Sequence, residues 1–261
     1  MGGAFARTIA VLILGLLGAA PAEPEGEWRP IFDGRTLEGW APKITGHRLG
    51  ENYRDTFRVA DGAIRVSYDG YGGRFAGRFG HLAYKLPLSA FRLRFEYRFS
   101  GDHLPDIESW QHSNSGIMFH GQAPETMSLD QKFPVSLEMQ LLGADGEGPR
   151  PTGNLCTPGT HVVMKGKLEK EHCVYSSSPT FPNGRWVRAE LQVDRNGNVR
   201  HLIEGVPVLT YGAPQLDVDD PDAKPLLARA GGRVEVNGGY LYLQSEGHPD
   251  EFRKIELMEL D

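Results

Sequence analysis

A short strand-like segment places a carboxylate and an amide where they could act together. In Ser136–Leu141 (SLEMQL) apolar residues alternate with polar ones, so Glu138 and Gln140 project from the same face of a strand. That polar face carries no lysine or arginine. An ordinary solvated face remains the alternative, but the pattern also fits the floor of a cleft.

A second strand-like segment ends in a dense group of polar residues. In Gly239–Pro249, Gln244 and Glu246 share one face, and His248 follows at the end of the segment. A carboxylate beside an imidazole can tune the pKa of the imidazole towards neutrality, which suits proton transfer. Glu, His and Gln side chains could also hold a divalent metal ion. A capped strand end with a solvated histidine is the plainer alternative.

Two further side chains are candidates for a cleft. Asn114 and His120 would share one face of the segment Asn114–Gly121, although a lone histidine is more often structural. Trp110 lies in the polar stretch before this segment. An exposed indole ring can stack on the C–H face of a sugar while its neighbours bind the hydroxyl groups. These residues together indicate a carbohydrate ligand.

The segments around these residues are typical of short strands joined by tight turns. Phe91–Phe99 alternates apolar and charged residues without a break, as a half-buried antiparallel strand does. Asn196-Gly197 supplies the positive φ angles of a hairpin turn. We therefore predict an all-β fold, a two-sheet antiparallel sandwich. The predicted strands are Phe57–Val59, Ala63–Val66, Leu82–Lys85, Phe91–Phe99, Ser115–His120, Val135–Leu142, Trp186–Val193, Asn198–Ile203, Val206–Tyr211, Gly239–Gln244 and Phe252–Glu259, with long loops at Gly143–Gly159 and Gln215–Arg229.

The N-terminal residues have the features of a signal peptide. Arg7 precedes an apolar run over residues 9–17, and Ala20-Pro21-Ala22 fits a cleavage pattern. The run is shorter than the roughly 20 residues of a helix that spans a bilayer, although a retained anchor is the alternative. We predict removal of residues 1–22, export to the periplasm or secretion, and no stable membrane association after cleavage. Residues 23–261 are expected to form one domain.

The cysteines and the charge set further limits. Cys156 and Cys173 are the two cysteines of the chain, and in an exported protein a disulfide is the first interpretation. Two buried thiols or metal ligands are the alternatives. The net charge is −6 and no basic patch stands out, so no nucleic acid is expected as a partner. The sequence has neither a P-loop nor a dinucleotide-binding fingerprint, so we expect no nucleotide cofactor.

Five motifs, in order along the chain, resemble the 3-keto-disaccharide hydrolase domain family, long known as a domain of unknown function. They are Ile31–Trp40 (IFDGRTLEGW), Asn114–Ile117 (NSGI), Leu137–Leu141 (LEMQL), Gly205–Val208 (GVPV), and Leu243–Pro249 (LQSEGHP) with Phe252–Ile255 (FRKI). The resemblance runs from about Trp28 to the C-terminus. It implies a concanavalin-like jelly-roll sandwich.

The resemblance also implies a carbohydrate substrate and a reaction. It implies cleavage of glycosides that a separate sugar-oxidising enzyme has first oxidised at C3. The ketone acidifies the C2 proton, a base removes it, and the C1 oxygen leaves by β-elimination; water addition then gives net hydrolysis. Such a site needs a base, an acid for the leaving group and a group that stabilises the enolate. A divalent metal ion or an arginine would serve as that group.

The resemblance assigns roles to individual residues. We expect His248 or His120 as the base, and Glu138 as the acid or a metal ligand, with His120 as a second candidate ligand. Arg253 could bind substrate or could instead be structural, in a buried salt bridge near Glu138. The segment Gly143–Cys173 is expected to shape the rim of the site. The full set of substrate-binding candidates is Asn114, Gln140, Gln244, Glu246, Arg253 and Trp110.

Two other functions fit the same residues. One is a carbohydrate-binding module without catalysis, because sandwich folds host lectins and glycanases alike. The other is a conventional glycanase, which needs two carboxyl groups roughly 5–9.5 Å apart. Glu138 and Glu246 are the candidate pair for that reaction.

Overall fold

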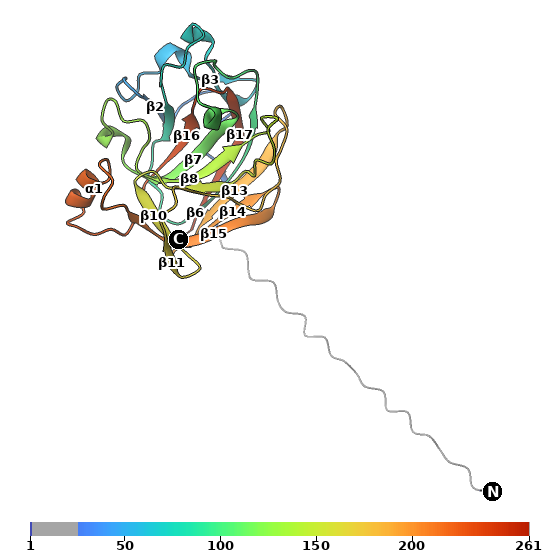
Figure 1. Ribbon diagram of the computed structural model, residues 1–261, viewed down its shortest axis with the longest axis vertical. Coiled ribbons are helices and arrows are strands. Elements are labelled where there is room, and N and C mark those ends of the chain that lie inside the picture. Colours follow the sequence, from blue (N-terminus) through green and yellow to red (C-terminus); the bar gives the residue numbers. More distant parts are fainter. Residues whose placement is uncertain (2–25, 261) are drawn as a thin grey trace.

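Two antiparallel sheets pack against each other in the part of the chain that the structure describes (Figure 1). The computed structural model describes Met1 and residues 26–260. Apart from Met1, the predicted signal peptide over residues 1–22 therefore lies outside the described residues. The predicted all-β, two-sheet jelly-roll sandwich is confirmed. None of the helices in the described residues has the length and apolar character needed to cross a membrane.

The larger sheet has ten strands within the described residues. In order across the sheet they are β11 (Lys167–Glu169), β10 (Thr160–Met164), β15 (Val206–Leu216), β14 (Val199–Ile203), β13 (Val187–Val193), β6 (Phe91–Phe99), β17 (Asp250–Glu259), β4 (Ala63–Val66) and β3 (Phe57–Ala60), while β1 (Arg29–Pro30) also pairs with β17.

The smaller sheet has seven strands in the same part of the chain. Across this sheet lie β12 (Cys173–Val174), β9 (Asn154–Cys156), β8 (Leu137–Leu142), β7 (Asn114–Gly121), β16 (Tyr240–Ser245), β5 (Gly80–Tyr84) and β2 (Trp40–Ile44). The connections contain the α-helix α1 (Lys224–Arg229) and the short 3-10 helices η1 (Tyr53–Asp55), η2 (Asp69–Tyr71), η3 (Ser109–Gln111) and η4 (Pro124–Thr126).

The strand predictions hold where alternation is strong. β6 begins and ends at the predicted residues, Phe91 and Phe99, because its apolar and charged residues alternate without a break. The predicted loop Gly143–Gly159 is wrong in part, since it contains the three-residue strand β9. The predicted loop Gln215–Arg229 contains the end of β15 and the helix α1. A strand of three residues is too short for its own sequence pattern to reveal it, and its partner strands define it instead.

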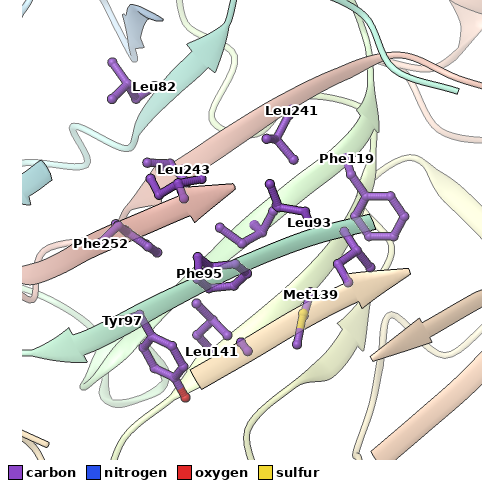
Figure 2. Packing of buried hydrophobic residues seen from close by; sticks show 14 of the residues in the cluster. Leu82, Leu93, Phe95, Tyr97, Phe119, Met139, Leu141, Leu241, Leu243 and Phe252 are labelled. Atoms are coloured by element: carbon purple, nitrogen blue, oxygen red, sulfur yellow. The ribbon is translucent and has the colours of Figure 1, made fainter. Parts of the chain in front are cut away.

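The core lies between the two sheets and takes its side chains from alternate positions of each strand (Figure 2). Leu93 and Phe95 of β6 are buried there, and Leu141 of β8 meets them from the smaller sheet. Burying such a side chain contributes roughly 1.5–3 kcal/mol. Because successive residues of a strand point to opposite faces, this packing turns Glu138 and Gln140 to the outer face of the smaller sheet.

A disulfide joins two strands at one edge of the smaller sheet. Cys156 of β9 lies opposite Cys173 of β12, and their sulfur atoms are bonded; the predicted disulfide is confirmed. On its other side Cys156 lies opposite Glu138 of β8. The bond therefore holds β12 next to the face of the sheet that carries Glu138.

Replacing both cysteines with serine is expected to lower the free energy of unfolding by about 3 kcal/mol, because the bond constrains a loop of moderate length in the unfolded chain. Urea denaturation of wild-type protein and of the Cys156→Ser/Cys173→Ser variant measures the difference. Wild-type protein in excess dithiothreitol is the matched control and should unfold like the variant. An unchanged unfolding midpoint in the variant would show that the bond adds no stability.

Candidate active site

The outer face of the smaller sheet carries a pocket of about 690 Å³, a size common among small-molecule sites. Its floor includes Glu138 and Gln140 of β8, Asn114 at the start of β7, and Glu246 just after β16. The walls come from loops and from β12, and they include Ser109, Trp110, Phe133, Asp145, Glu147, Arg150, His172, Cys173 and Tyr175. The pocket therefore brings together side chains from segments that are far apart in the sequence.

A glycine on β7 makes room for the carboxyl group of Glu138. A Cβ atom at Gly116 would lie 2.4 Å from Oε1 of Glu138 and 2.9 Å from its Cδ, far inside van der Waals contact. On the other side of β7, Leu243 lies opposite Ile117, which brings Gln244 of β16 to the level of Gly116. The carboxyl group of Glu138 therefore lies over the backbone of β7, between β8 and β16.

Glu138 and Glu246 are buried carboxyl groups with raised pKa values. The two residues are only 6% and 2% exposed. Burial raises the pKa of Glu138 to about 8. Burial first, and then the charges of Glu138 and Asp250, raise the pKa of Glu246 well above its usual value. Burial alone opposes ionisation of Glu138, whereas neighbouring carboxylates also oppose that of Glu246, and two carboxyl groups in such unlike surroundings can serve as base and acid.

Hydrogen bonds fix the side chains around this pair. Asn114 donates from Nδ2 to the carbonyl oxygen of Trp110 at 2.9 Å, while its Oδ1 is buried with no partner among the described residues. Oε1 of Gln140 accepts a hydrogen bond of 3.0 Å from Nδ2 of Asn154. The Trp110 side chain is half-exposed and its ring lies parallel to that of Phe79. The site thus presents fixed amides and an open indole ring beside the carboxyl groups.

Gln244 is buried beside these groups, although it does not line the pocket itself. Neither atom of its amide has a hydrogen-bond partner among the described residues. Across the strand pair lies His81 of β5, which burial keeps neutral by lowering its pKa to about 3. A buried amide without a partner is energetically unfavourable. Gln244 is therefore a candidate to bind a ligand or water atom that enters the floor at Gly116.

His248 is not among the residues that line the pocket. Its Nδ1 accepts a hydrogen bond of 2.9 Å from the backbone N–H of Ser113. Burial first, and then His103 and His112, lower the pKa of His248 to about 4. Ser113 in turn bonds to the backbone of residues 143 and 144. The structure therefore places His248 to position the loop that follows β8, and its role as a base stays a prediction.

The structure also places His120 and Arg253 away from the pocket lining. Nε2 of His120 donates to a backbone carbonyl at 2.8 Å, and burial lowers the pKa of the ring. Arg253 donates from Nε to Glu96 at 2.7 Å and lies over the ring of Trp186. Arg253 does form the salt bridge of the structural alternative, but with Glu96 in the larger sheet and not near Glu138. Neither His120 nor Arg253 lines the pocket that contains Glu138 and Glu246, so their assigned roles remain predictions.

Arg150, His172 and Tyr175 are among the pocket residues that were not singled out from the sequence. Arg150 forms an ion pair with Asp145, with 2.9 Å between Nη1 and Oδ2. Tyr175 is largely exposed. All of these lie in or just after the segment predicted to shape the rim, and that segment does line the pocket. Loop residues have no periodicity that would identify them one by one, and the cysteine pair was the only feature of the sequence that pointed to this part of the pocket.

The donor set does not fit a resident divalent metal ion. The described residues contain no group of three or more His, Cys, Asp or Glu side chains arranged to hold one. The raised pKa values of Glu138 and Glu246 favour the neutral carboxyl form, whereas hard cations bind carboxylates. The proposed chemistry therefore uses no metal ion.

Several solved structures are similar to this chain at low sequence identity. A protein of Parabacteroides distasonis ATCC 8503, inferred to be a glycosyl hydrolase, has a TM-score of 0.50 and 18% identity over 90% of this chain and 94% of that one. A second such protein of the same strain has a TM-score of 0.49 and 15% identity over 90% and 100% of the two chains. The carbohydrate-binding module CBM66 of Bacillus subtilis has a TM-score of 0.46 and 6% identity over 83% and 93%. No curated protein matches the chain.

A family match covers almost all of the described chain. The profile of the 3-keto-alpha-glucoside-1,2-lyase-like domain matches residues 27–258, which include every residue of the pocket floor. The resemblance carried by the five sequence motifs is thereby confirmed. The chain belongs to the 3-keto-alpha-glucoside-1,2-lyase-like domain family.

Proposed function

We propose that this chain cleaves glycosides that carry a ketone at C3. The observation that carries the proposal is the pair of buried carboxyl groups, Glu138 and Glu246, which share one pocket and both have raised pKa values in unlike surroundings. The family supports the substrate class. The exposed rings of Trp110 and Tyr175 at the same pocket supply surfaces on which a sugar or an aromatic aglycone can stack.

Glu138 acts as the base in this proposal, because burial alone opposes its ionisation, whereas the charges of Glu138 and Asp250 also oppose that of Glu246. Its carboxylate takes the C2 proton; the C–H electron pair forms a C2=C3 double bond, and the ketone π pair moves onto the C3 oxygen. When this enolate returns to the ketone, a C1=C2 double bond forms and the C1–O bond breaks. Glu246, which keeps its proton to higher pH, donates it to the departing oxygen. Water then adds at C1 and a proton returns to C2, which gives net hydrolysis.

The proposed reaction depends on a second enzyme. A C3 ketone must be introduced by a separate sugar-oxidising enzyme before this chain can act. The features of residues 1–22 favour export, so we place the cleavage step in the periplasm or outside the cell. The substrate would then meet this chain only after oxidation at C3.

Release of 4-nitrophenol from the 3-keto and the unoxidised forms of 4-nitrophenyl glucoside tests the proposal. We expect turnover of the keto form alone. Cleavage of the unoxidised glucoside would instead favour a conventional glycanase that uses the same two carboxyl groups. Saturable binding by calorimetry without turnover of either substrate would favour a binding module. Either of those results would contradict the proposed function.

The cleavage rate is expected to rise with pH as Glu138 ionises. Burial raises the pKa of Glu138 to about 8, so kcat/KM should increase about tenfold per pH unit well below pH 8 and level off above it. The profile is measured against an enzyme-free blank, because keto-glycosides eliminate spontaneously in alkali. Glu246 is protonated while Glu138 titrates, so Glu246→Gln removes the proposed acid and not a charge, and it should lower the rate without moving the rise. A rate that falls through pH 8 would reverse the roles and make Glu138 the acid.

A further inference from the structure

We propose that Arg150 stabilises the enolate oxygen that forms at C3 during the reaction. This inference rests on the proposed function, whose chemistry creates a negative charge where the ketone was. Arg150 is the single lysine or arginine among the pocket-lining side chains in the described part of the chain. It lies in the loop before β9, and its side chain is mostly buried.

The charges around the pocket make such a cation necessary. The lining includes four carboxyl side chains, those of Glu138, Asp145, Glu147 and Glu246. When the enolate forms, Glu138 has taken the C2 proton and Glu246 still holds its own, so the carboxylates that oppose the new charge are those of Asp145 and Glu147, and low polarity strengthens that opposition. The other basic group of the lining is His172, and burial lowers the pKa of its ring. Arg150 is therefore the group that can offset the new charge.

Arg150 is held in a fixed position in the lining of the pocket that contains Glu138 and Glu246. Its backbone N–H donates to Oγ1 of Thr180 at 2.6 Å, and its guanidinium group is paired with Asp145. The next residue is also anchored: Nδ2 of Asn154 donates to the carbonyl of Pro151 at 2.9 Å and to Oε1 of Gln140 at 3.0 Å. Gln140 follows Glu138 by two positions on the same face of β8. A donor fixed in advance stabilises developing charge without a reorganisation cost during the reaction.

Two other candidate cations have partners elsewhere in the described residues. Arg253 is paired with Glu96 in the larger sheet. Lys43 is buried in β2, where its Nζ donates to the carbonyl of Leu129 at 3.1 Å, and it does not line the pocket. The role that the family resemblance leaves open for an arginine or a metal ion is therefore assigned to Arg150.

Arg150 donates a hydrogen bond and keeps its own protons throughout. As the C2 proton passes to Glu138, negative charge builds on the C3 oxygen, and the guanidinium N–H groups bond to that oxygen more strongly than to the ketone. The bond weakens again when the ketone returns and the C1–O bond breaks. Since the interaction is stronger in the transition state than in the bound substrate, its loss should lower kcat more than it raises KM.

Steady-state kinetics of Arg150→Gln on the 3-keto glucoside test this inference. We expect kcat to fall about 10²–10³-fold with KM changed by less than about threefold. Arg150→Lys keeps the charge without the planar fork and should retain an intermediate rate. Added guanidinium chloride at a concentration that leaves the protein folded should partly restore Arg150→Gly, whereas a purely structural defect would not respond.

Two controls separate catalysis from structure. Arg150→Gln leaves Asp145 without its partner, so the double variant Asp145→Asn/Arg150→Gln removes that orphaned charge. If the double variant regains the wild-type rate, the loss came from Asp145 and the inference is wrong. Arg188→Gln alters an exposed arginine in β13, paired with Glu204, and should keep the wild-type rate. Wild-type kcat in Arg150→Gln would overturn the inference alone, whereas an inactive wild-type protein would overturn the proposed function with it.

Discussion

Glu138→Gln is expected to lower kcat/KM on a 3-keto glucoside by about 10³-fold or more while it stabilises the folded protein at pH 8. Glutamine keeps the size of the side chain above Gly116 but cannot take the C2 proton. The general base in such a reaction typically contributes 10²–10⁴-fold. Because the C2 hydrogen is only weakly acidic even beside a ketone, we expect the loss of kcat/KM to lie in the upper part of that range.

The stabilisation follows from the direction of the pKa shift. The pKa of Glu138 rises from an ordinary 4.5 to about 8 in the folded protein, so between these values the folded state binds the proton that the unfolded state has released. Stability therefore falls as the pH rises from about 4.5 to 8. Glutamine removes this dependence. The unfolding free energy of the variant, relative to wild type, should increase by roughly 2–4 kcal/mol across that range.

Urea denaturation at pH 4.5 and pH 8 measures this difference, and 4-nitrophenol release at pH 8 measures the rate. Glu38→Gln is the matched control, because Glu38 is exposed and should change neither quantity. A Glu138→Gln variant that cleaves at the wild-type rate would remove Glu138 from the chemistry. If the stability of Glu138→Gln relative to wild type does not increase between pH 4.5 and pH 8, the pKa of Glu138 is not raised in the folded protein.

Gly116→Ala is expected to lower kcat/KM at least about 100-fold, although it adds one methyl group. That methyl group would lie 2.4 Å from Oε1 of Glu138, so the carboxyl group must leave its place over β7. A displacement of about 1 Å in a reacting group can lower a rate 10²-fold. Gly116 lies within an extended strand and is not among the glycines with positive φ. Alanine therefore fits the backbone, and the effect is expected to come from Glu138.

A second-site change tests that explanation of Gly116→Ala. Glu138→Asp shortens the side chain, so the double variant Gly116→Ala/Glu138→Asp should accommodate both the methyl group and the carboxyl group. Its kcat/KM should be higher than that of Gly116→Ala alone, and also higher than the value expected if the two single losses were multiplied. Kinetics of the two single variants and the double variant form a double-mutant cycle. Independent, multiplicative losses would mean that Gly116 acts through something other than the carboxyl group. Thermal unfolding of each variant excludes a loss caused by misfolding.

Strand parity predicted the floor of the site well. Glu138 and Gln140 were expected on one face of β8 and do line the pocket together, because the alternate residues Leu137, Met139 and Leu141 are buried in the core. Glu246 also reaches the pocket. The same argument applies to Phe91–Phe99, where unbroken alternation defined the whole strand. A period of two is enough information when one face of a strand is buried.

Parity could not place the residues beyond the ends of strands. His248 was expected to follow Gln244 and Glu246 at the end of the strand, but β16 ends at Ser245 and Gly247 has a φ of 101°. The chain turns there, and His248 meets Ser113 instead of the pocket. Arg253 was placed near Glu138 through the family motif, yet it belongs to the other sheet, where register alone decides its partner, Glu96.

The loop residues needed the three-dimensional structure. Arg150 and Tyr175 are 25 residues apart in the sequence and reach one pocket only because β9 and β12 pair beside β8. The disulfide between these strands was predicted only because the signal peptide indicated export to an oxidising compartment. No periodic signal marks the loops that follow β8 and β12, since their positions depend on tertiary contacts such as the bond from Arg150 to Thr180.

The fate of the C2 hydrogen tests the central claim most directly. A 3-keto glucoside labelled with deuterium at C2 is incubated with the protein in ordinary water, and NMR follows the label while 4-nitrophenol release follows cleavage. Proton abstraction by Glu138 predicts that each cleaved molecule loses its deuterium to solvent, at a rate well above the enzyme-free blank, and that Glu138→Gln slows both events together. Cleavage with the deuterium retained at C2 would contradict the account, because the glycosidic bond would then break without an enolate.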